Sequence, residues 1–136
     1  MRLILDTNIL ISAMVKNSTT RKLLLLPEFE FYIPEYALEE IKKHIPIIKK
    51  KSRLNVNEIN VLLNLLMENI SIIPANKIKP HIKKAQKIIG SIDENDVPFI
   101  ALALSLPNNG IWTNDTHFTR QKSIKIWTTE TLLKTI

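Results

Sequence analysis

Three aspartates stand at the borders of apolar runs, where a charged side chain is least expected. Asp6 lies in "LILDTNIL", Asp96 in "DENDVPFIALAL" and Asp115 in "IWTNDTHF". A buried carboxylate costs free energy unless it is paired, hydrogen-bonded or bound to a cation. The three positions therefore indicate either structural caps or a site.

The apolar runs predict the elements that would position these acids. Residues 2–5 and 111–113 are typical of short buried strands, with Asp6 and Asp115 just beyond their ends. Residues 96–106 are almost entirely apolar after Asp96 and predict a buried helix. In a parallel sheet, ligands bind outside the carboxyl ends of the strands. If the two strands are neighbours, the three acids lie at one edge.

A fourth acid comes from the helix predicted over residues 35–45. Glu39 projects away from the apolar stripe of this helix, whereas Glu40 lies at its margin and can lean over the sheet edge. Converging carboxylates raise one another's pKa unless cations lie between them. Oxygen ligands without cysteine suit Mg²⁺ or Mn²⁺, which can activate water for displacement at phosphorus.

Each acid also has a purely structural explanation. Asp93 and Asp96 are good helix-capping residues, and Asp6 could cap the helix that starts near Asn8. Asp115 could build a turn. The three histidines show no metal-ligand spacing, and only His117 is near the predicted site.

The remaining elements alternate between strands and helices. Residues 28–33, 71–73 and 124–127 predict strands; residues 9–15, 20–26, 57–67, 80–89 and 129–134 predict helices. Pro46 is expected to end the helix 35–45, Asn57 to cap the next one, and the Lys-rich segment 47–57 to lie outside the core. Alternation of this kind predicts an α/β fold with a parallel sheet covered on both faces. No linker divides the chain, so we expect one domain over residues 1–136.

Charge and composition indicate a polyanionic partner and an intracellular protein. Lys and Arg number 19 against 13 Asp and Glu, a net charge of +6. Basic clusters attract nucleic acid, although a solvated lysine-rich surface explains them equally; the candidate contacts are Lys49, Lys50, Lys51, Lys83 and Lys84. The chain has no cysteine and no apolar run of about 18 residues. We therefore expect a cytoplasmic protein with no membrane partner.

Four segments together resemble the PIN domain, the nuclease fold of VapC-type toxins. They are "LILDTNILISA", "IPEYALEEI", "DENDVPFIALAL" and "IWTNDTHF", in the family's order and spacing over nearly the whole chain. The resemblance implies a three-layer α/β/α sandwich whose five-stranded parallel sheet has the order 3-2-1-4-5. It also implies a Mg²⁺- or Mn²⁺-dependent endoribonuclease, and many relatives are toxins paired with an antitoxin.

The resemblance assigns roles to individual residues. It implies that the catalytic, metal-binding acids are Asp6, Glu40, Asp96 and Asp115, with supporting polar residues Asn8, Asp93, Thr113 and Asn114. It also suggests a homodimer, and Ile11, Val15, Leu23 and Leu26 are candidates for an exposed apolar patch.

Other classes remain as alternatives. The main one is a non-catalytic PIN-fold module that binds RNA or protein. A phosphotransfer domain fits less well, because Asn8 stands where one such family needs a second aspartate, and "IIPANK" lacks the acid that a receiver domain requires.

Overall fold

A computed structural model describes residues 1–16 and 18–136. Its centre is one parallel sheet of five strands in the order β3-β2-β1-β4-β5, which confirms the predicted fold and strand order. The strands are β1 (Arg2–Leu5), β2 (Glu30–Pro34), β3 (Ile70–Ile73), β4 (Ile111–Trp112) and β5 (Ile126–Trp127).

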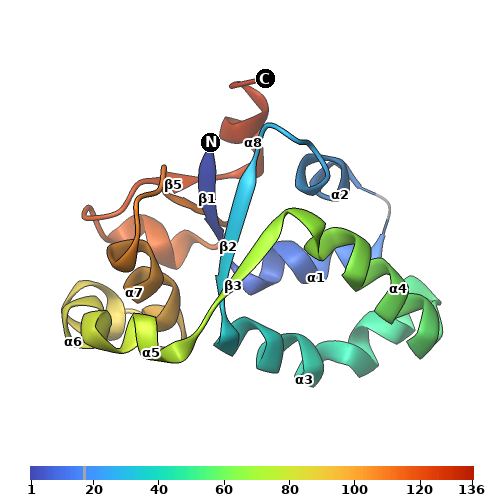
Figure 1. Cartoon of the computed structure of the whole chain (residues 1–136), viewed down its shortest axis with the longest axis horizontal. Helices are drawn as coiled ribbons and strands as arrows, with labels where there is room; N and C mark the ends of the chain where they lie inside the picture. The colour runs from blue at the N-terminus through green and yellow to red at the C-terminus, as the bar shows by residue number, and fades with distance from the viewer. Residues whose placement is uncertain (17) are drawn as a thin grey trace.

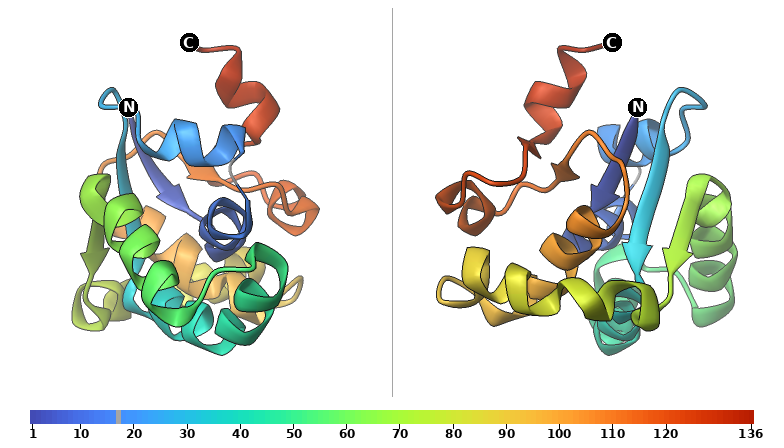
Figure 2. Two further views of the ribbon diagram at one scale, coloured as in Figure 1. Left: turned by 90° about the vertical axis from the view of Figure 1, so that its right-hand side faces the viewer. Right: turned by 60° about the vertical axis from the view of Figure 1, so that its left-hand side comes forward.

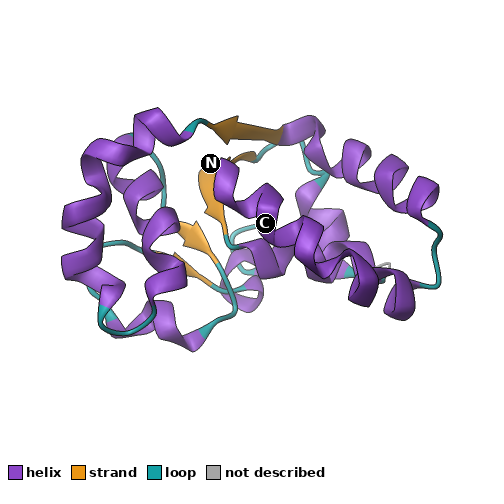
Figure 3. Cartoon of the chain, turned by 90° about the horizontal axis from the view of Figure 1, so that it is seen from below, coloured by secondary structure: helices purple, strands orange, loops and turns teal. Residues whose placement is uncertain are grey.

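Helices cover both faces of the sheet, as parallel strands require. Figure 1 shows one group made of α1 (Thr7–Val15), α2 (Thr19–Leu24), α3 (Glu35–Ser52) and α4 (Val56–Leu66). The opposite group is α5 (Ala75–Ile78), α6 (Ile82–Ala85) and α7 (Val97–Ser105). The C-terminal α8 (Thr129–Leu133) stands apart from both groups, as the two views of Figure 2 show. Figure 3 shows the helices surrounding the strands from below.

The core follows the predicted pattern. Phe29, just before β2, and Phe31 and Ile33 within it are alternate residues and are all buried, and Trp112 of β4 is fully buried. Every residue of α7 from Phe99 to Ala103 is also buried. The alternating pattern around β2 and the continuous apolar run of α7 therefore both predicted the buried residues correctly.

The pairing of β1 with β4 determines where the acids lie. Ile4 pairs with Ile111 and Leu5 with Trp112, and the backbone N–H of Asp6 donates to the carbonyl of Trp112 over 3.1 Å. The residues just after the two strands, Asp6 and Thr113, are thus neighbours at the carboxyl edge.

The prediction that Pro46 ends a helix is wrong. α3 continues through Pro46 to Ser52 and ends at Arg53, whose φ of 62° is left-handed. Proline removes one helical hydrogen bond, but Ile48 lies two turns after Ile41 and both are buried. Burial of this face extends the helix, so much of the Lys-rich segment 47–57 is part of α3 rather than outside the core.

Two other boundaries differ from the prediction. The helix after this segment is capped by Asn55, not Asn57: the Asn55 side chain accepts from the Glu58 N–H and the Glu58 side chain accepts from the Asn55 N–H. Residues 80–89, predicted as one α-helix, are helical but of mixed type: they run through a 3₁₀ turn (Lys79–His81), α6 and a π turn (Gln86–Gly90). The helical stretch ends at Gly90 as predicted, and Pro80 lies in its 3₁₀ first turn, where no regular α-helical hydrogen bond is lost.

The strand ends also move by a few residues. β2 begins at Glu30 rather than residue 28, β4 ends at Trp112, and β5 begins at Ile126 rather than residue 124. Such shifts are normal, because strand ends depend on the partner strand. Within the described residues, no helix combines the length and the apolar character that crossing a bilayer requires.

Candidate metal and active site

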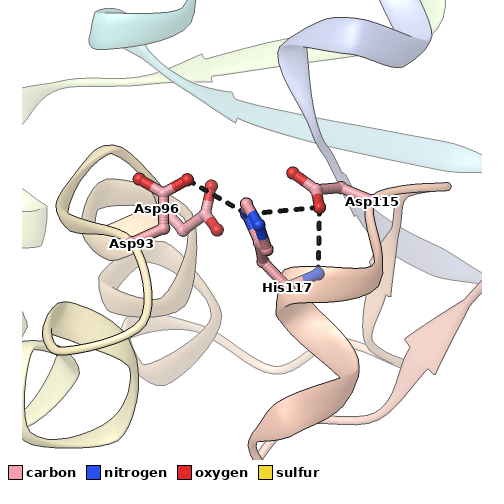
Figure 4. Close-up of side chains that lie close together, drawn as sticks. All are labelled: Asp93, Asp96, Asp115 and His117. Atoms are coloured by element: carbon pink, nitrogen blue, oxygen red, sulfur yellow. Dashed lines mark hydrogen bonds and ion pairs between the residues drawn. The ribbon is translucent and has the colours of Figure 1, made fainter.

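Four side chains converge at the carboxyl edge of the sheet, and we call them the acid group: Asp93, Asp96, Asp115 and His117 (Figure 4). Each offers one ligand atom, and these atoms all lie within 4.8 Å of one another. Asp93 and Asp96 come from the segment before α7, whereas Asp115 and His117 follow β4. Two distant parts of the chain therefore build one group.

A tight turn positions Asp93 and Asp96. The backbone N–H groups of Ile92 and Asp93 both donate to the carbonyl of Ile89, each over 2.9 Å, which ends the π turn. The Asp93 carboxylate then accepts from the Asn95 N–H over 2.9 Å and caps a 3₁₀ turn, Glu94–Asp96. α7 starts immediately afterwards.

Thr113 positions the other half of the group. Its hydroxyl oxygen accepts from the Asp115 N–H over 2.9 Å, and Asp115 in turn caps the 3₁₀ turn Thr116–Arg120 by accepting from the His117 N–H over 2.9 Å. His117 Nδ1 then lies 3.2 Å from an Asp93 oxygen and 3.4 Å from an Asp115 oxygen. The imidazole thus lies between two carboxylates.

Asp6 is buried and fully engaged. The Thr113 hydroxyl donates to one of its oxygens over 2.7 Å, and the Asn8 N–H donates to the other over 3.4 Å, which caps α1. Burial raises the pKa of the Asp6 carboxyl, and the Thr113 hydrogen bond opposes that effect.

Glu40 is held in a similar way. The hydroxyl of Thr7, a buried residue of α1, donates to Glu40 over 2.7 Å. Burial raises the pKa of Glu40, the Thr7 hydroxyl lowers it, and the nearby Asp6 carboxylate raises it further. α1 and α3 are thus joined by a threonine–glutamate contact close to Asp6.

Asp96 differs from the other acids. It is only 6% exposed, its side chain makes no helix-capping bond, and its Oδ2 atom is buried with no hydrogen-bond partner among the described residues. Burial is the main cause that raises the pKa of Asp96 to about 8, followed by the charges of Asp93, Asp115, Asp6 and Glu40.

The predicted site residues divide into three sets. Asp96 and Asp115 lie in the acid group, together with Asp93. Asp6 and Glu40 lie beside that group, each bound to a threonine hydroxyl. Asn114 points elsewhere: its side chain accepts from the Thr129 N–H over 3.0 Å and ties this loop to α8, while Asn8 is exposed.

Sequence reasoning missed that His117 joins the acids. The signal was its position two residues after Asp115, where a capping turn brings the side chain back toward the carboxylate. The candidate lysines remain on the surface, Lys83 and Lys84 on α6 and Lys49, Lys50 and Lys51 at the end of α3.

The acid group fits a divalent cation. Three carboxylates and one imidazole offer ligand atoms within a span of a few ångströms. The buried Asp96 oxygen has no hydrogen-bond partner in the described part of the chain to stabilise its charge, and a buried charge in this state is costly unless a cation lies beside it. Capping alone explains Asp93 and Asp115 but not Asp96.

Comparisons with known proteins identify the fold and the family of the chain. No curated protein matches the sequence. A chain in the crystal structure of VapBC2 from Rickettsia felis, bound to a DNA fragment from their promoter, is similar in fold: the TM-score is 0.72 at 20% identity, over 94% of this chain and 98% of that one. The family model of the PIN domain matches residues 4–136. The chain belongs to the PIN domain family.

Proposed function

We propose that this protein is a Mg²⁺- or Mn²⁺-dependent endoribonuclease and the toxin of a toxin–antitoxin pair. The observation that carries the proposal is the Oδ2 atom of Asp96. This atom is buried, has no hydrogen-bond partner among the described residues, and belongs to a side chain that lies beside three other potential metal ligands. A site evolved only for stability would satisfy or remove such a group.

The chain's own residues divide the work. Asp96, Asp115 and Asp93 would hold the cation, and His117 lies close enough to join them. The Thr113 hydroxyl fixes Asp6, and the Thr7 hydroxyl fixes Glu40, so both carboxylates face the group in one orientation. When bound, the divalent cation supplies charge stabilisation and an activated water for displacement at phosphorus.

The surface charge supports an RNA substrate. The net charge is +6 although the site itself is acidic, so the basic residues lie elsewhere. Lys83 and Lys84 are exposed on α6, on the same side of the sheet as α7. We propose that they contact phosphates of single-stranded RNA, with Lys49, Lys50 and Lys51 as a second contact.

Partner binding is also part of the proposal. The similar chain from Rickettsia felis comes from a structure of VapBC2 bound to a DNA fragment from their promoter. The exposed patch predicted from residues 11, 15, 23 and 26 is not present, because Leu23 is buried in the core and Ile11, Val15 and Leu26 are partly buried against it. Exposed apolar side chains lie instead on α4, at Val56, Val61 and Leu65. We propose that an antitoxin covers this face of α4 and that the protein forms a homodimer, which light scattering with and without the partner tests.

Calorimetric titration of Mn²⁺, paired with a cleavage assay on single-stranded RNA, tests the central claim. We expect Mn²⁺ to bind the wild-type protein, and Asp96→Asn and Asp6→Asn to weaken that binding strongly. Mn²⁺ binding without cleavage of any RNA would favour the non-catalytic alternative. Absence of both would contradict the metal site itself.

A further inference from the structure

A cavity of about 480 Å³ lies beside the acid group. Its walls are almost entirely apolar; most of them come from Pro34, Tyr36, Ala75, Ile78, Ile82 and Pro98. The cavity is therefore bounded by the end of β2, the start of α3, the α5–α6 segment and the first turn of α7. The proposed function assigns nothing to it.

Two connections place the cavity next to the acids. The Tyr36 hydroxyl donates to the Asn95 side chain over 3.3 Å, and Asn95 lies between Asp93 and Asp96 in the capping turn. Tyr36 also precedes Glu40 by one turn of α3. Burial is the main cause that raises the pKa of the Tyr36 hydroxyl, and the charges of Glu40, Glu39, Asp93 and Asp96 raise it further.

The chemistry of the walls selects the kind of ligand. An apolar wall offers no donors to a phosphate, but it suits a flat ring that can stack on tyrosine. The Tyr36 and Phe99 rings form a T-shaped pair, with centroids 6.4 Å apart at 69°, and this contact restricts the orientation of the Tyr36 ring. Pockets of about 300–1,000 Å³ with apolar walls are typical of small-ligand sites.

Charge at the opening favours a nucleotide over an uncharged apolar ligand. Lys79 lines the cavity and is exposed, and Lys83 follows one turn later on α6. Glu35 also lines it, but its carboxylate accepts from the Ala75 N–H over 3.3 Å. A strand with its phosphate at the acid group can therefore place a neighbouring base in the cavity and a further phosphate near the lysines.

We propose that this cavity binds one unpaired base of the RNA, adjacent to the phosphate held at the acid group. The inference rests on the proposed function and extends it, because a base bound in the Tyr36 cavity would add to the affinity of the protein for RNA. Tyr36 would act through stacking and not through proton transfer.

Binding of RNA by an Asp96→Asn protein, which should not cleave, provides the test. Single-stranded oligonucleotides carry one abasic site that is moved along the strand. We expect one abasic position to weaken binding by about tenfold, the effect of losing one stacked base. Adding Tyr36→Ala to this protein should weaken its binding of intact RNA by a similar factor. The loss of affinity caused by the abasic site (the abasic penalty) should then disappear at that one position of the RNA and nowhere else.

Matched variants separate this role from structural effects. Tyr36→Phe keeps the ring and loses only the hydroxyl contact to Asn95, so it should keep the abasic penalty that Tyr36→Ala loses. Tyr32→Ala removes a partly buried tyrosine from β2, away from the cavity, and should retain the abasic penalty. Ala75→Phe fills the cavity from an exposed position, so it carries the test if Tyr36→Ala does not fold.

The outcomes are distinct. An abasic penalty that is equal in the parent and in Tyr36→Ala would overturn the base site while leaving the nuclease proposal intact. Loss of all RNA binding by the parent would overturn both. If Tyr36→Ala and Ala75→Phe instead convert a dimer to a monomer in sedimentation and leave the abasic penalty unchanged, the cavity is an interface between copies, and the base site is wrong.

Discussion

Asp6 and Asp96 are two buried carboxylates at the same edge of one sheet, yet their surroundings differ. Asp6 accepts a hydroxyl and a backbone N–H, and it caps a helix. Asp96 is equally buried, makes no capping bond and leaves one oxygen without a partner among the described residues. The first is stabilised by the protein itself, whereas the second is stabilised only by protonation or by a cation. Asp6 therefore has a structural role whether or not it also takes part in the proposed metal site. Asp96 has no such structural bonds among the described residues, so only the proposed metal site gives it a role.

The largest expected effect is on cleavage. Replacing Asp96 with Asn should lower single-turnover RNA cleavage in Mn²⁺ by about a thousandfold, because it removes a ligand that the fold does not otherwise use. Asp115→Asn, which keeps the turn-forming shape, should also lose cleavage by orders of magnitude. Circular dichroism checks that both variants are folded. A folded Asp96→Asn protein with normal cleavage would contradict the metal assignment.

Stability should move in opposite directions for the two acids. In EDTA at pH 8, Asp96→Asn should raise the free energy of unfolding by at least about 1 kcal/mol, since it removes a buried charge repelled by its neighbours. Asp6→Ala should lower it by about 0.5–2 kcal/mol through loss of the α1 cap. Thermal and urea melts measure both. A destabilised Asp96→Asn protein would mean that this side chain is structural.

The pH dependence should have a definite sign. The pKa of Asp96 is about 8 in the folded protein and near its ordinary value of 3.8 in the unfolded chain. Between these values the folded state binds the additional proton, so stability in EDTA should fall as pH rises from about 4 to about 8. The raised pKa values of Asp6 and Glu40 act in the same direction.

Urea unfolding at pH 5, 6, 7 and 8 tests this sign. Asp96→Asn should flatten the profile, and saturating Mn²⁺ should also flatten it because the cation binds the deprotonated acids. A wild-type protein that gains stability toward pH 8 in EDTA would show that Asp96 is already ionised and stabilised by the fold.

The smallest expected effect concerns the lysines. Lys83→Gln with Lys84→Gln should weaken RNA binding severalfold at low salt and reduce the dependence of log Kd on log salt by about 1 to 2. Lys134→Gln is the control, because this lysine directly follows α8, which stands apart from the helices of the proposed RNA path (Figure 2), and it pairs only loosely with Glu130 at 3.8 Å. If the Lys83/Lys84 variant and the Lys134 variant weaken RNA binding equally, the protein attracts RNA through its overall charge and not along a defined path on its surface.

Much of the fold follows from local patterns. Burial alternates correctly in β2, and the run after Asp96 gives the buried α7. The strand order came from the family resemblance, because periodicity reports which face is buried but not which strands are neighbours. Pro46 misled the prediction because its cost is local, whereas α3 continues beyond it and buries Ile48 on the same face as Ile41.

The site was less accessible to sequence reasoning. The positions of Asp96 and Asp115 follow from the ends of predicted elements. The joining of His117 to Asp93 depends on two capping turns, before α7 and after β4, that meet only in three dimensions. The engagement of Asp6 and Glu40 by Thr113 and Thr7 likewise depends on side-chain contacts that spacing does not encode.

The pairing of β1 with β4 determines when the acid group can form during synthesis of the chain. The hydrogen bond between Thr113 and Asp6 spans 107 positions of the chain, and a contact of this separation forms late because loop closure precedes any gain. A growing polypeptide that has reached only residue 108 already contains Asp6, Asp93 and Asp96, but it has neither β4 nor Asp115. The acid group therefore cannot form until the chain has been synthesised through β4 and the turn that follows it, so its assembly has to follow the pairing of β1 with β4.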